Sequence, residues 1–364
     1  MFLSMEAFGG MGGIAKYNRD FLRALSSAPE VSEVVAVPRR MLLSPEPLPP
    51  KLTYITGALP NRITYIKAVI KLLKENPRFD VIGCGHIKLL PMAFLAKLVT
   101  RAPLFIVIYG IDAWKPINNV IIKYLLSKID VIISISEITK QRFIEWSRLT
   151  QKKCFILPNA IAQRNYGVGP KSQDLLEQYG LSDKTVLMTL GRLAPEEQYK
   201  GFDEIMELLP VLSKQIPHIA YLIVGDGKDR ARLEAKAQAL GVRDRVVFTG
   251  FIPEAEKADH YRLADAFVMP GRGEGFGFVF LEALACGIPV VGSKLDGSRE
   301  ALRGGALGIL VDPGRPDEIQ AGVLKALQQP PGVIPAGLDY FSFENFEKRC
   351  HRILRQVIKS RGVG

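Results

Sequence analysis

The sequence predicts an α/β protein made of two Rossmann-like domains, each with a doubly wound parallel sheet. Short apolar strand segments alternate with helical stretches along most of the chain, which is the pattern of parallel sheets with helices on both faces. Glycine turns follow several of these segments, as they do in folds that bind ligands at strand ends. A chain of 364 residues is also too long for one typical core and suits two domains.

The elements of each predicted domain follow in order. The first domain, residues 1–163, opens with a short strand, the glycine cluster GGMGG and a helix, and continues with the strand segments VVAVP, KLTYIT, FDVIGCG, LFIVIYG, KIDVIIS and KCFILP. Proline, glycine and asparagine in residues 158–169 interrupt the apolar periodicity, so we place the boundary there. The second domain, residues 164–364, resumes with KTVLMTLGRL, GFDEIMELLPVLSKQ and AYLIVGDG. It ends in the amphipathic stretch ENFEKRCHRILRQVIKS.

The most informative stretch is PGRGEGFGFVFLEALACGIPVVG, residues 270–292. An apolar strand precedes it and another ends it, so the unit is strand, loop, helix and strand. Its alternating glycines let the backbone approach a ligand closely, and the amides that open the helix after Gly277 suit an anion such as phosphate. Glu274 in the loop and Glu282 in the helix can face the same ligand. Carboxylates accept hydrogen bonds from the vicinal hydroxyls of sugars.

The spacing of Glu274 and Glu282, followed by ALACGIPVVGS, resembles the E-x7-E signature of retaining glycosyltransferases of family GT4, which have the GT-B fold. The resemblance covers nearly the whole chain. It implies two Rossmann-like domains that face each other across a cleft, with residues 1–163 binding the acceptor and residues 164–364 binding the nucleotide sugar. Chains of this type often finish with a helix that crosses back onto the first domain, and the last amphipathic stretch is suited to that.

The resemblance also assigns donor-binding residues. Glu274 would bind hydroxyls of the donor sugar, and Glu282 would bind the nucleotide ribose. Arg192 directly follows a strand and Lys200 precedes the next helix, so both charges can converge on one anion; they match the diphosphate-binding Arg and Lys of the family. The remaining predicted donor residues are the loop residues Gly275, Phe276, Gly277 and Phe278, and Phe251 and Ile252, whose backbone would hold the base.

Four residues of the first domain are further candidates. Gly12 and Gly13 lie closest to the amides of the first helix, and in the family this loop approaches the donor phosphate. His86 follows the strand segment DVIGCG, and Asp112 follows LFIVIYG beside a tryptophan whose ring suits the apolar face of a sugar. Tyr109 stands where the family often has histidine. The role of orienting the donor or acceptor therefore stays open between Asp112 and His86.

We therefore expect a retaining hexosyltransferase that uses a UDP- or GDP-sugar, with a lipid-linked, cell-envelope or exopolysaccharide glycan as acceptor. The departing diphosphate must be stabilised. The chain has no Asp-x-Asp, so we expect no metal and no cofactor, with Arg192, Lys200 and the amides at Gly12, Gly13 and Gly277 in that role. The alternatives are a nucleotide-sugar epimerase and a non-catalytic nucleotide-sugar-binding subunit, although the presence of Glu274 argues against the second.

The positive charge lies in the first half of the chain. Residues 1–163 contain 22 Lys and Arg against 11 Asp and Glu, whereas residues 164–364 contain 26 of each. This asymmetry indicates an anionic partner, an acceptor or a membrane surface. Nucleic acid is not expected, because no matching motif is present. No apolar run reaches the roughly 18 residues of a membrane span, so we expect a cytoplasmic protein that can attach peripherally to the inner face of the membrane.

The stretch NRITYIKAVIKLLKENPR, residues 61–78, is the clearest basic segment. Its pattern predicts an amphipathic helix. The apolar stripe, Ile63, Ile66, Ile70 and Leu73, is expected to pack on the sheet of its own domain. The lysines of the other face, Lys67, Lys71 and Lys74, would then meet solvent or an anionic membrane.

Overall fold

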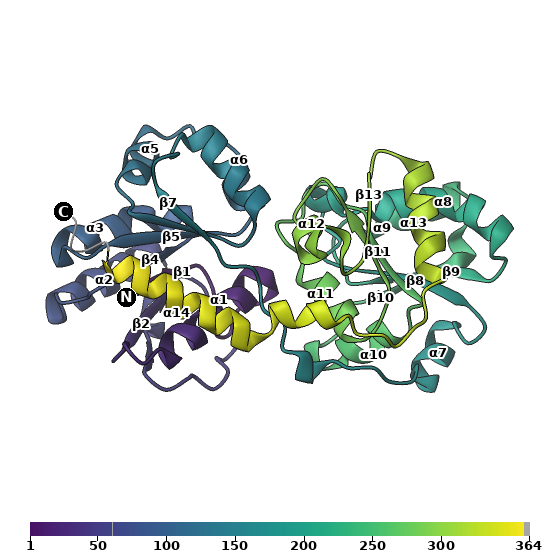
Figure 1. Cartoon of the computed structure of the whole chain (residues 1–364), viewed down its shortest axis with the longest axis horizontal. Coiled ribbons are helices and arrows are strands. Elements are labelled where there is room, and N and C mark those ends of the chain that lie inside the picture. Colours follow the sequence, from purple (N-terminus) through teal and green to yellow (C-terminus); the bar gives the residue numbers. More distant parts are fainter. Residues whose placement is uncertain (60, 360–364) are drawn as a thin grey trace. The chain divides into compact units, whose positions relative to one another are not determined.

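The computed structural model describes residues 1–59 and 61–359 and confirms the predicted fold class. The chain forms two compact units (Figure 1). Unit 1 contains Met1–Ala160 together with the C-terminal segment that begins at Phe343, and unit 2 contains Ile161–Ser342. Each unit holds one parallel sheet with helices packed against it. Within the described residues, no helix is both long and apolar enough to cross a membrane.

Unit 1 is built on a seven-stranded sheet with the strand order β3-β2-β1-β4-β5-β6-β7, and every neighbouring pair is parallel. The strands are β1 (Phe2–Ser4), β2 (Val34–Pro38), β3 (Leu52–Tyr54), β4 (Ile82–Gly85), β5 (Leu104–Ile108), β6 (Val131–Ser134) and β7 (Lys153–Ile156). All residues of β5 are buried. Such continuous apolar strands are expected where helices cover both faces of a sheet.

The helices of unit 1 are α1 (Gly12–Ser27), α2 (Arg62–Glu75), α3 (Leu90–Thr100), α4 (Ile111–Trp114), α5 (Val120–Ser127), α6 (Glu137–Ser147) and α14 (Phe343–Lys359). One core joins the sheet to α2, α3 and α5. The C-terminal helix α14 instead packs beside α1. The rings of Phe346 and Tyr17 are 5.7 Å apart, and the Nε2 atom of His351 lies 2.8 Å from the carbonyl oxygen of Ala24.

The predicted packing of α2 was wrong in register. The helix forms as expected, but its buried row is Tyr65, Val69 and Leu73. Of the predicted stripe, Ile63, Ile66 and Ile70 are exposed, and only Leu73 is buried. Both rows are apolar at helical spacing. The row of Tyr65, Val69 and Leu73 packs in the core with the sheet, and the isoleucines therefore lie on the outward side of the helix.

Unit 2 is built on a six-stranded parallel sheet with the order β10-β9-β8-β11-β12-β13. Its strands are β8 (Thr185–Leu190), β9 (Ile219–Val224), β10 (Val246–Gly250), β11 (Ala266–Met269), β12 (Val290–Ser293) and β13 (Ile309–Val311). Its helices are α7 (Gln173–Tyr179), α8 (Phe202–Gln215), α9 (Arg230–Ala239), α10 (Lys257–Arg262), α11 (Phe278–Ala285), α12 (Ser298–Ala301) and α13 (Pro316–Leu327).

Both sheets contain a point where the strand order reverses. In unit 1 the reversal lies between β1 and β4, and in unit 2 it lies between β8 and β11. Ligands of doubly wound sheets bind outside the carboxyl ends of the strands at such a point. The topology therefore directs attention to the loops after β1, β4, β8 and β11.

Candidate functional site

The loops after β8 and β11 bring several predicted residues of unit 2 to the reversal point. Arg192 follows β8 by two residues, and Lys200 ends the 3-10 turn Pro195–Lys200 that leads into α8. Pro270 to Gly277 form the loop between β11 and α11. The predicted order of strand, loop, helix and strand is confirmed, and β11 pairs in parallel with β12.

Arg192 and Lys200 converge as predicted, but the anion between them is Glu197. One carboxylate oxygen of Glu197 contacts the guanidinium of Arg192, and the other lies 2.7 Å from Nζ of Lys200. Burial alone would raise the pKa of Glu197, but Arg192 and Lys200 outweigh it and hold that pKa below its ordinary value. Sequence reasoning missed Glu197, because an acid in a polar turn gives no sign of which cations it meets.

Glu274 lies close enough to Lys200 and Glu197 for both charges to act on its carboxyl. Burial raises the pKa of its carboxyl to about 6, with Asp296 and Glu197 adding to the rise and Lys200 opposing it. Such a carboxyl is half ionised near pH 6 and mostly a carboxylate at pH 7 and above. The group can then accept charge-assisted hydrogen bonds from a bound sugar.

The Glu274 loop is held by the segment after β12, which the sequence interpretation did not single out. Oδ2 of the buried Asp296 accepts a hydrogen bond from the backbone amide of Glu274 at 2.9 Å, and the amide of Gly297 donates to the carbonyl of Glu274 at 2.8 Å. A Cβ on Gly297 would lie 2.2 Å from the carbonyl oxygen of Gly275. Only glycine fits at this close approach.

Close packing restricts the remaining residues of the loop between β11 and α11. Gly277, with a φ of 91°, precedes α11, and a Cβ there would meet the ring of Phe280 at 2.5 Å. Phe276 is buried, whereas Gly275 and Phe278 are half-buried. A Cβ on Gly273 would meet the ring of Tyr199 at 2.4 Å. The glycines therefore allow the loop to lie close to its neighbours, and Gly277, the N-cap residue of α11, has no side chain that could cap the helix.

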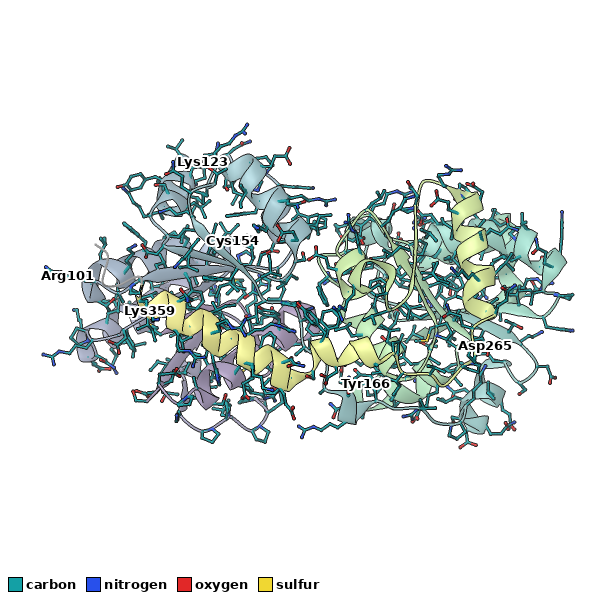
Figure 2. All side chains as sticks on the ribbon, viewed as in Figure 1. Arg101, Lys123, Cys154, Tyr166, Asp265 and Lys359 are labelled. Carbon is teal, nitrogen blue, oxygen red and sulfur yellow. The ribbon has the colours of Figure 1, made fainter. Side chains whose placement is uncertain are left out.

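Glu282 lies in a second cluster, farther along α11. Its side chain is buried and accepts a hydrogen bond from the hydroxyl of Tyr261 at 2.9 Å. Nζ of Lys257 is 3.7 Å from the same carboxylate oxygen. Burial and the charge of Glu282 together raise the pKa of Tyr166, a residue of the segment that precedes α7 (Figure 2). The carboxylate is thus fixed by side chains more than 20 residues away, which no local motif reveals.

The end of β10 and the turn after β9 complete the description of unit 2. Phe251 follows β10 with an exposed side chain, and Ile252 beside it is buried. The VGDG turn packs tightly on the Arg192 segment: a Cβ on Gly225 or Gly227 would lie 2.0 or 1.9 Å from a backbone carbonyl oxygen of that segment. Glycine is needed at both positions because the segment after β9 lies very close to the segment after β8 at the reversal point.

In unit 1, Gly12 and Gly13 begin α1, as predicted. Gly12 has a φ of 84°, and a Cβ there would meet no atom within 4 Å. The preceding Met11 is exposed and provides no side-chain cap to the helix. The first amides of α1 are therefore available for an anion. The same reversal point includes His86, the residue after β4.

His86 caps a 3-10 turn through its Nδ1 atom, which accepts a hydrogen bond from the amide of Lys88 at 3.0 Å. Burial, assisted by the charges of Lys88 and Arg40, lowers the pKa of the His86 imidazole to about 4. The ring is therefore neutral at pH 7. With Nδ1 acting as acceptor, the proton is on Nε2, which can donate a hydrogen bond.

Asp112 opens the short helix α4 after β5. Its Oδ2 atom is buried and has no hydrogen-bond partner in the part of the chain that the structure describes. Burial raises the pKa of this carboxyl to about 7, against backbone hydrogen bonds that lower it. The neighbouring Tyr109 is buried and donates to Oδ1 of Asn18 at 2.6 Å. Tyr109 thus joins the end of β5 to α1.

The tryptophan beside Asp112 is already engaged within unit 1. The indole nitrogen of Trp114 donates to Oγ1 of Thr139 at 3.1 Å, and the guanidinium of Arg142 lies 3.9 Å from the ring centroid. That face of the ring is occupied by a cation. Within the described residues, no group of three or more His, Cys, Asp or Glu side chains is arranged to hold a metal ion.

Comparison with protein families identifies both halves of the chain. Residues 172–334 match the model described as glycosyl transferases group 1, and residues 11–163 match the model of glycosyltransferase family 4. The GDP-mannose-dependent alpha-(1-6)-phosphatidylinositol monomannoside mannosyltransferase of Mycolicibacterium smegmatis is 32% identical over 275 residues, which are 71% of each chain. The phosphatidyl-myo-inositol mannosyltransferase of Mycobacterium tuberculosis is 40% identical over 150 residues, 41% of this chain and 38% of that one.

Solved structures with the same architecture include enzymes of low sequence identity. Sucrose-phosphate synthase from Thermosynechococcus elongatus has a TM-score of 0.77 at 18% identity and covers 99% of this chain and 100% of its own. Anabaena HepE in complex with UDP and glucose has a TM-score of 0.74 at 20% identity, with 97% and 99% covered. At these identities the likeness concerns the fold. Together with the family matches in both halves, it shows that this chain is a glycosyltransferase that belongs to family GT4 and has the GT-B fold.

Proposed function

We propose that this enzyme transfers a hexose from a nucleoside-diphosphate sugar to a lipid-linked glycan acceptor, with retention of configuration and without a metal ion. The observation that carries the proposal is the placement of Arg192, Lys200 and Glu274 on the loops after β8 and β11, at the reversal point of the unit 2 sheet. Two cations and a carboxylate at one sheet edge can bind the two parts of such a donor, its diphosphate and its sugar. The cations suit its diphosphate and the carboxylate suits its sugar hydroxyls.

We propose further donor contacts for other groups of unit 2 and for the start of α1 in unit 1. The amides from Gly275 to Phe278 are proposed to bind a phosphate oxygen, because they lie at the start of α11, where the helix dipole favours an anion. The buried carboxylate of Glu282 is proposed to bind the ribose hydroxyls, and the backbone at Phe251 and Ile252 to bind the base. In unit 1 the open amides at Gly12 and Gly13 are proposed to bind an anionic group of a substrate.

The chemical step breaks the bond between the anomeric carbon and the phosphate oxygen and forms a bond from that carbon to the acceptor oxygen. In the proposed front-side attack, the acceptor hydroxyl gives its proton to the departing phosphate. Negative charge then grows on the diphosphate, and Arg192 and Lys200 stabilise it more in the transition state than in the ground state. Asp112 or the Nε2–H of His86 is proposed to orient the substrates.

GDP-mannose is our first choice of donor. The relatives matched above are named as mannosyltransferases, one of them as GDP-mannose-dependent, and both names contain phosphatidylinositol or phosphatidyl-myo-inositol. A phosphatidylinositol-type acceptor carries a phosphate and is held in a membrane. The excess of basic residues in the first half of the chain fits such an acceptor, and it supports a cytoplasmic enzyme that works peripherally at the inner face of the membrane.

A donor screen tests this proposal. A ligand that binds only the folded protein raises its melting temperature, and at a fixed concentration the shift increases with the logarithm of its affinity. We expect GDP-mannose to give the largest shift among GDP- and UDP-sugars, in buffer containing EDTA, and the shift to fall in Glu282→Gln. A strict need for added Mg²⁺ or Mn²⁺ in transfer assays would contradict the metal-free mechanism. Absence of a shift with every nucleotide sugar would contradict the donor site itself.

A further inference from the structure

The helices α2, α3 and α5 form one outward surface of unit 1, which we call the three-helix face. All three pack on the same side of the sheet through one shared core, and α3 contacts both of the others. Their outward sides carry exposed apolar side chains, which are Ile63, Ile66, Ile70, Leu98, Val99, Val120, Ile121 and Tyr124. Exposed apolar residues are ordinary when single, but a group on adjacent helices marks an interaction site.

Helix α2 shows the pattern most clearly. Residues three and four apart share a face of a helix, so Ile63, Ile66 and Ile70 form one row. The exposed Lys67, Lys71 and Lys74 form the neighbouring row. The side chain of Ile63 is 66% exposed. The core row of this helix is formed by Tyr65, Val69 and Leu73, so the isoleucines lie outside the shared core of unit 1.

Helix α5 repeats the combination of apolar and basic side chains. Val120 is 80% exposed and Ile121 is 67% exposed, both at the start of the helix. Lys123 is exposed next to them, and Nζ of Lys128 lies 5.0 Å from the ring centroid of Tyr124. At the end of α3, the exposed Arg101 follows the apolar Leu98 and Val99. Arg101 and Lys123 project outward from unit 1 (Figure 2).

The acidic residues of this region leave the basic excess uncompensated. Residues 61–130 contain eleven Lys and Arg and four Asp and Glu. Three of the four acids act on other groups: Glu75 lies 3.7 Å from Lys71, Asp130 lies 2.6 Å from Lys97, and the charge of Asp80 acts on the N-terminal ammonium of Met1. The fourth is Asp112, whose Oδ2 atom is buried. Among the described residues, Lys67 and Lys74 make no ion pair. The three-helix face is therefore both apolar and positively charged.

We propose that the three-helix face docks onto an anionic lipid bilayer, with the isoleucines of α2 and Val120 and Ile121 of α5 inserted at the boundary between headgroups and acyl chains. The lysines then contact lipid phosphates. The pattern favours a bilayer over a protein partner, because the centres of protein interfaces are depleted of lysine, whereas lysine beside an inserted apolar row can extend to the headgroups. The inference deepens the proposed lipid-linked acceptor and relies on that proposal only for its biological purpose.

Vesicle co-sedimentation tests the docking. Wild-type protein should bind vesicles of equal parts phosphatidylcholine and phosphatidylglycerol, and bind phosphatidylcholine alone weakly. The triple variant Ile63→Ser, Ile66→Ser, Ile70→Ser should lower the partition coefficient roughly tenfold or more at every salt concentration. The variant Lys67→Glu, Lys71→Glu, Lys74→Glu should lose binding mainly at low salt. The matched control replaces three exposed apolar residues of unit 2, Val211, Val333 and Ile334, by serine and should bind like wild type.

A fluorescent reporter measures insertion directly. In an Ile66→Trp variant, emission should shift to shorter wavelength on anionic vesicles and be quenched by lipids brominated on their acyl chains. Wild-type binding that is unchanged by the isoleucine variant, or a tryptophan that stays in water, would overturn insertion. A wild-type dimer that becomes monomeric in the isoleucine variant without lipid would show that a second copy covers the face.

The donor-induced shift in melting temperature separates this inference from the proposed function. Each variant above should keep the wild-type shift, because every substituted residue lies outside the predicted donor site. If the shift is present and vesicle binding is absent, the docking inference is wrong and the donor proposal stands. If the protein binds vesicles and no nucleotide sugar shifts its melting temperature, the donor proposal is wrong and the docking inference stands.

Discussion

At the scale of single residues, a local motif was enough to predict the positions of the two carboxylates, but not the residues that they contact. Glu274 and Glu282 are eight positions apart on one loop and helix, so spacing alone positions them. Their partners come from distant segments: Asp296 after β12, and Tyr261 at the end of α10. These contacts are formed by tertiary packing. Local motif spacing in a single sequence does not show which distant segments will meet.

The raised pKa of Glu274 leads to a pH prediction. Its carboxyl has a pKa of about 6, above the ordinary value, because of burial. The carboxylate form that accepts sugar hydroxyls is therefore lost as pH falls through about 6, and turnover should fall with it. Glu274→Gln should lower kcat strongly and remove that limb of the pH profile while leaving the melting temperature nearly unchanged. Wild-type kcat in Glu274→Gln would rule out a role for this carboxylate in the donor site.

Glu197 leads to a prediction about product affinity. Its carboxylate pairs with Arg192 and Lys200. If these cations bind the diphosphate as proposed, the diphosphate must compete with Glu197 for them. Glu197→Gln removes this charge, and we expect nucleoside diphosphates to bind about tenfold more tightly at low salt, equivalent to about 1.4 kcal/mol. Turnover should fall where product release becomes limiting.

Isothermal titration with GDP and UDP measures this change. A control at an ion pair of similar chemistry in unit 2, Glu318→Gln, removes the carboxylate beside Lys294 and should leave the affinity unchanged. Weaker binding in Glu197→Gln would instead show that this carboxylate holds the two cations in a binding-competent position.

At the scale of elements, the sequence predicted the strands and the main helices well but not which side of a helix faces the core. The apolar strands of a parallel sheet are buried on both faces, so their sequence signal is continuous. Helix α2 has two apolar rows, and periodicity alone cannot choose between them. In the structure the buried row is Tyr65, Val69 and Leu73. The same ambiguity concealed the exposed isoleucines of the three-helix face.

The contact between two loops leads to a prediction for Gly297. The amide of Gly297 fixes the carbonyl of Glu274, and a Cβ there would collide with the carbonyl oxygen of Gly275. Gly297→Ala should displace the Glu274 loop, lower kcat at least tenfold and cost about 1 to 3 kcal/mol of stability. Gly57→Ala is the matched control, since its Cβ would meet nothing within 4 Å. Equal kcat values for the two variants would argue against a positioning role for the second loop.

At the scale of the whole molecule, unit 1 contains both the start of the chain and the final helix. Five side chains of α14 are buried: Phe346, Cys350, Ile353, Leu354 and Val357. Four of them lie against α1 and the sheet, next to residues such as Phe21 and Phe105. Each buried apolar side chain contributes about 1.5 to 3 kcal/mol, and a domain as a whole is stable by about 5 to 15 kcal/mol. Unit 1 therefore depends on a segment that follows all of unit 2 in the sequence.

This dependence predicts that a chain ending at Ser342 loses the folded state of unit 1 while unit 2 keeps its own core. Both tryptophans of the protein, Trp114 and Trp146, lie in unit 1, so tryptophan fluorescence in urea reports the unfolding of this unit alone. The milder Phe346→Ala should lower its free energy of unfolding by about 3 to 5 kcal/mol. Arg355→Ala, which removes only an exposed ion pair with Glu30, should leave this free energy nearly unchanged. If the shortened chain gave the same fluorescence transition as wild type, α14 would contribute nothing to the stability of unit 1.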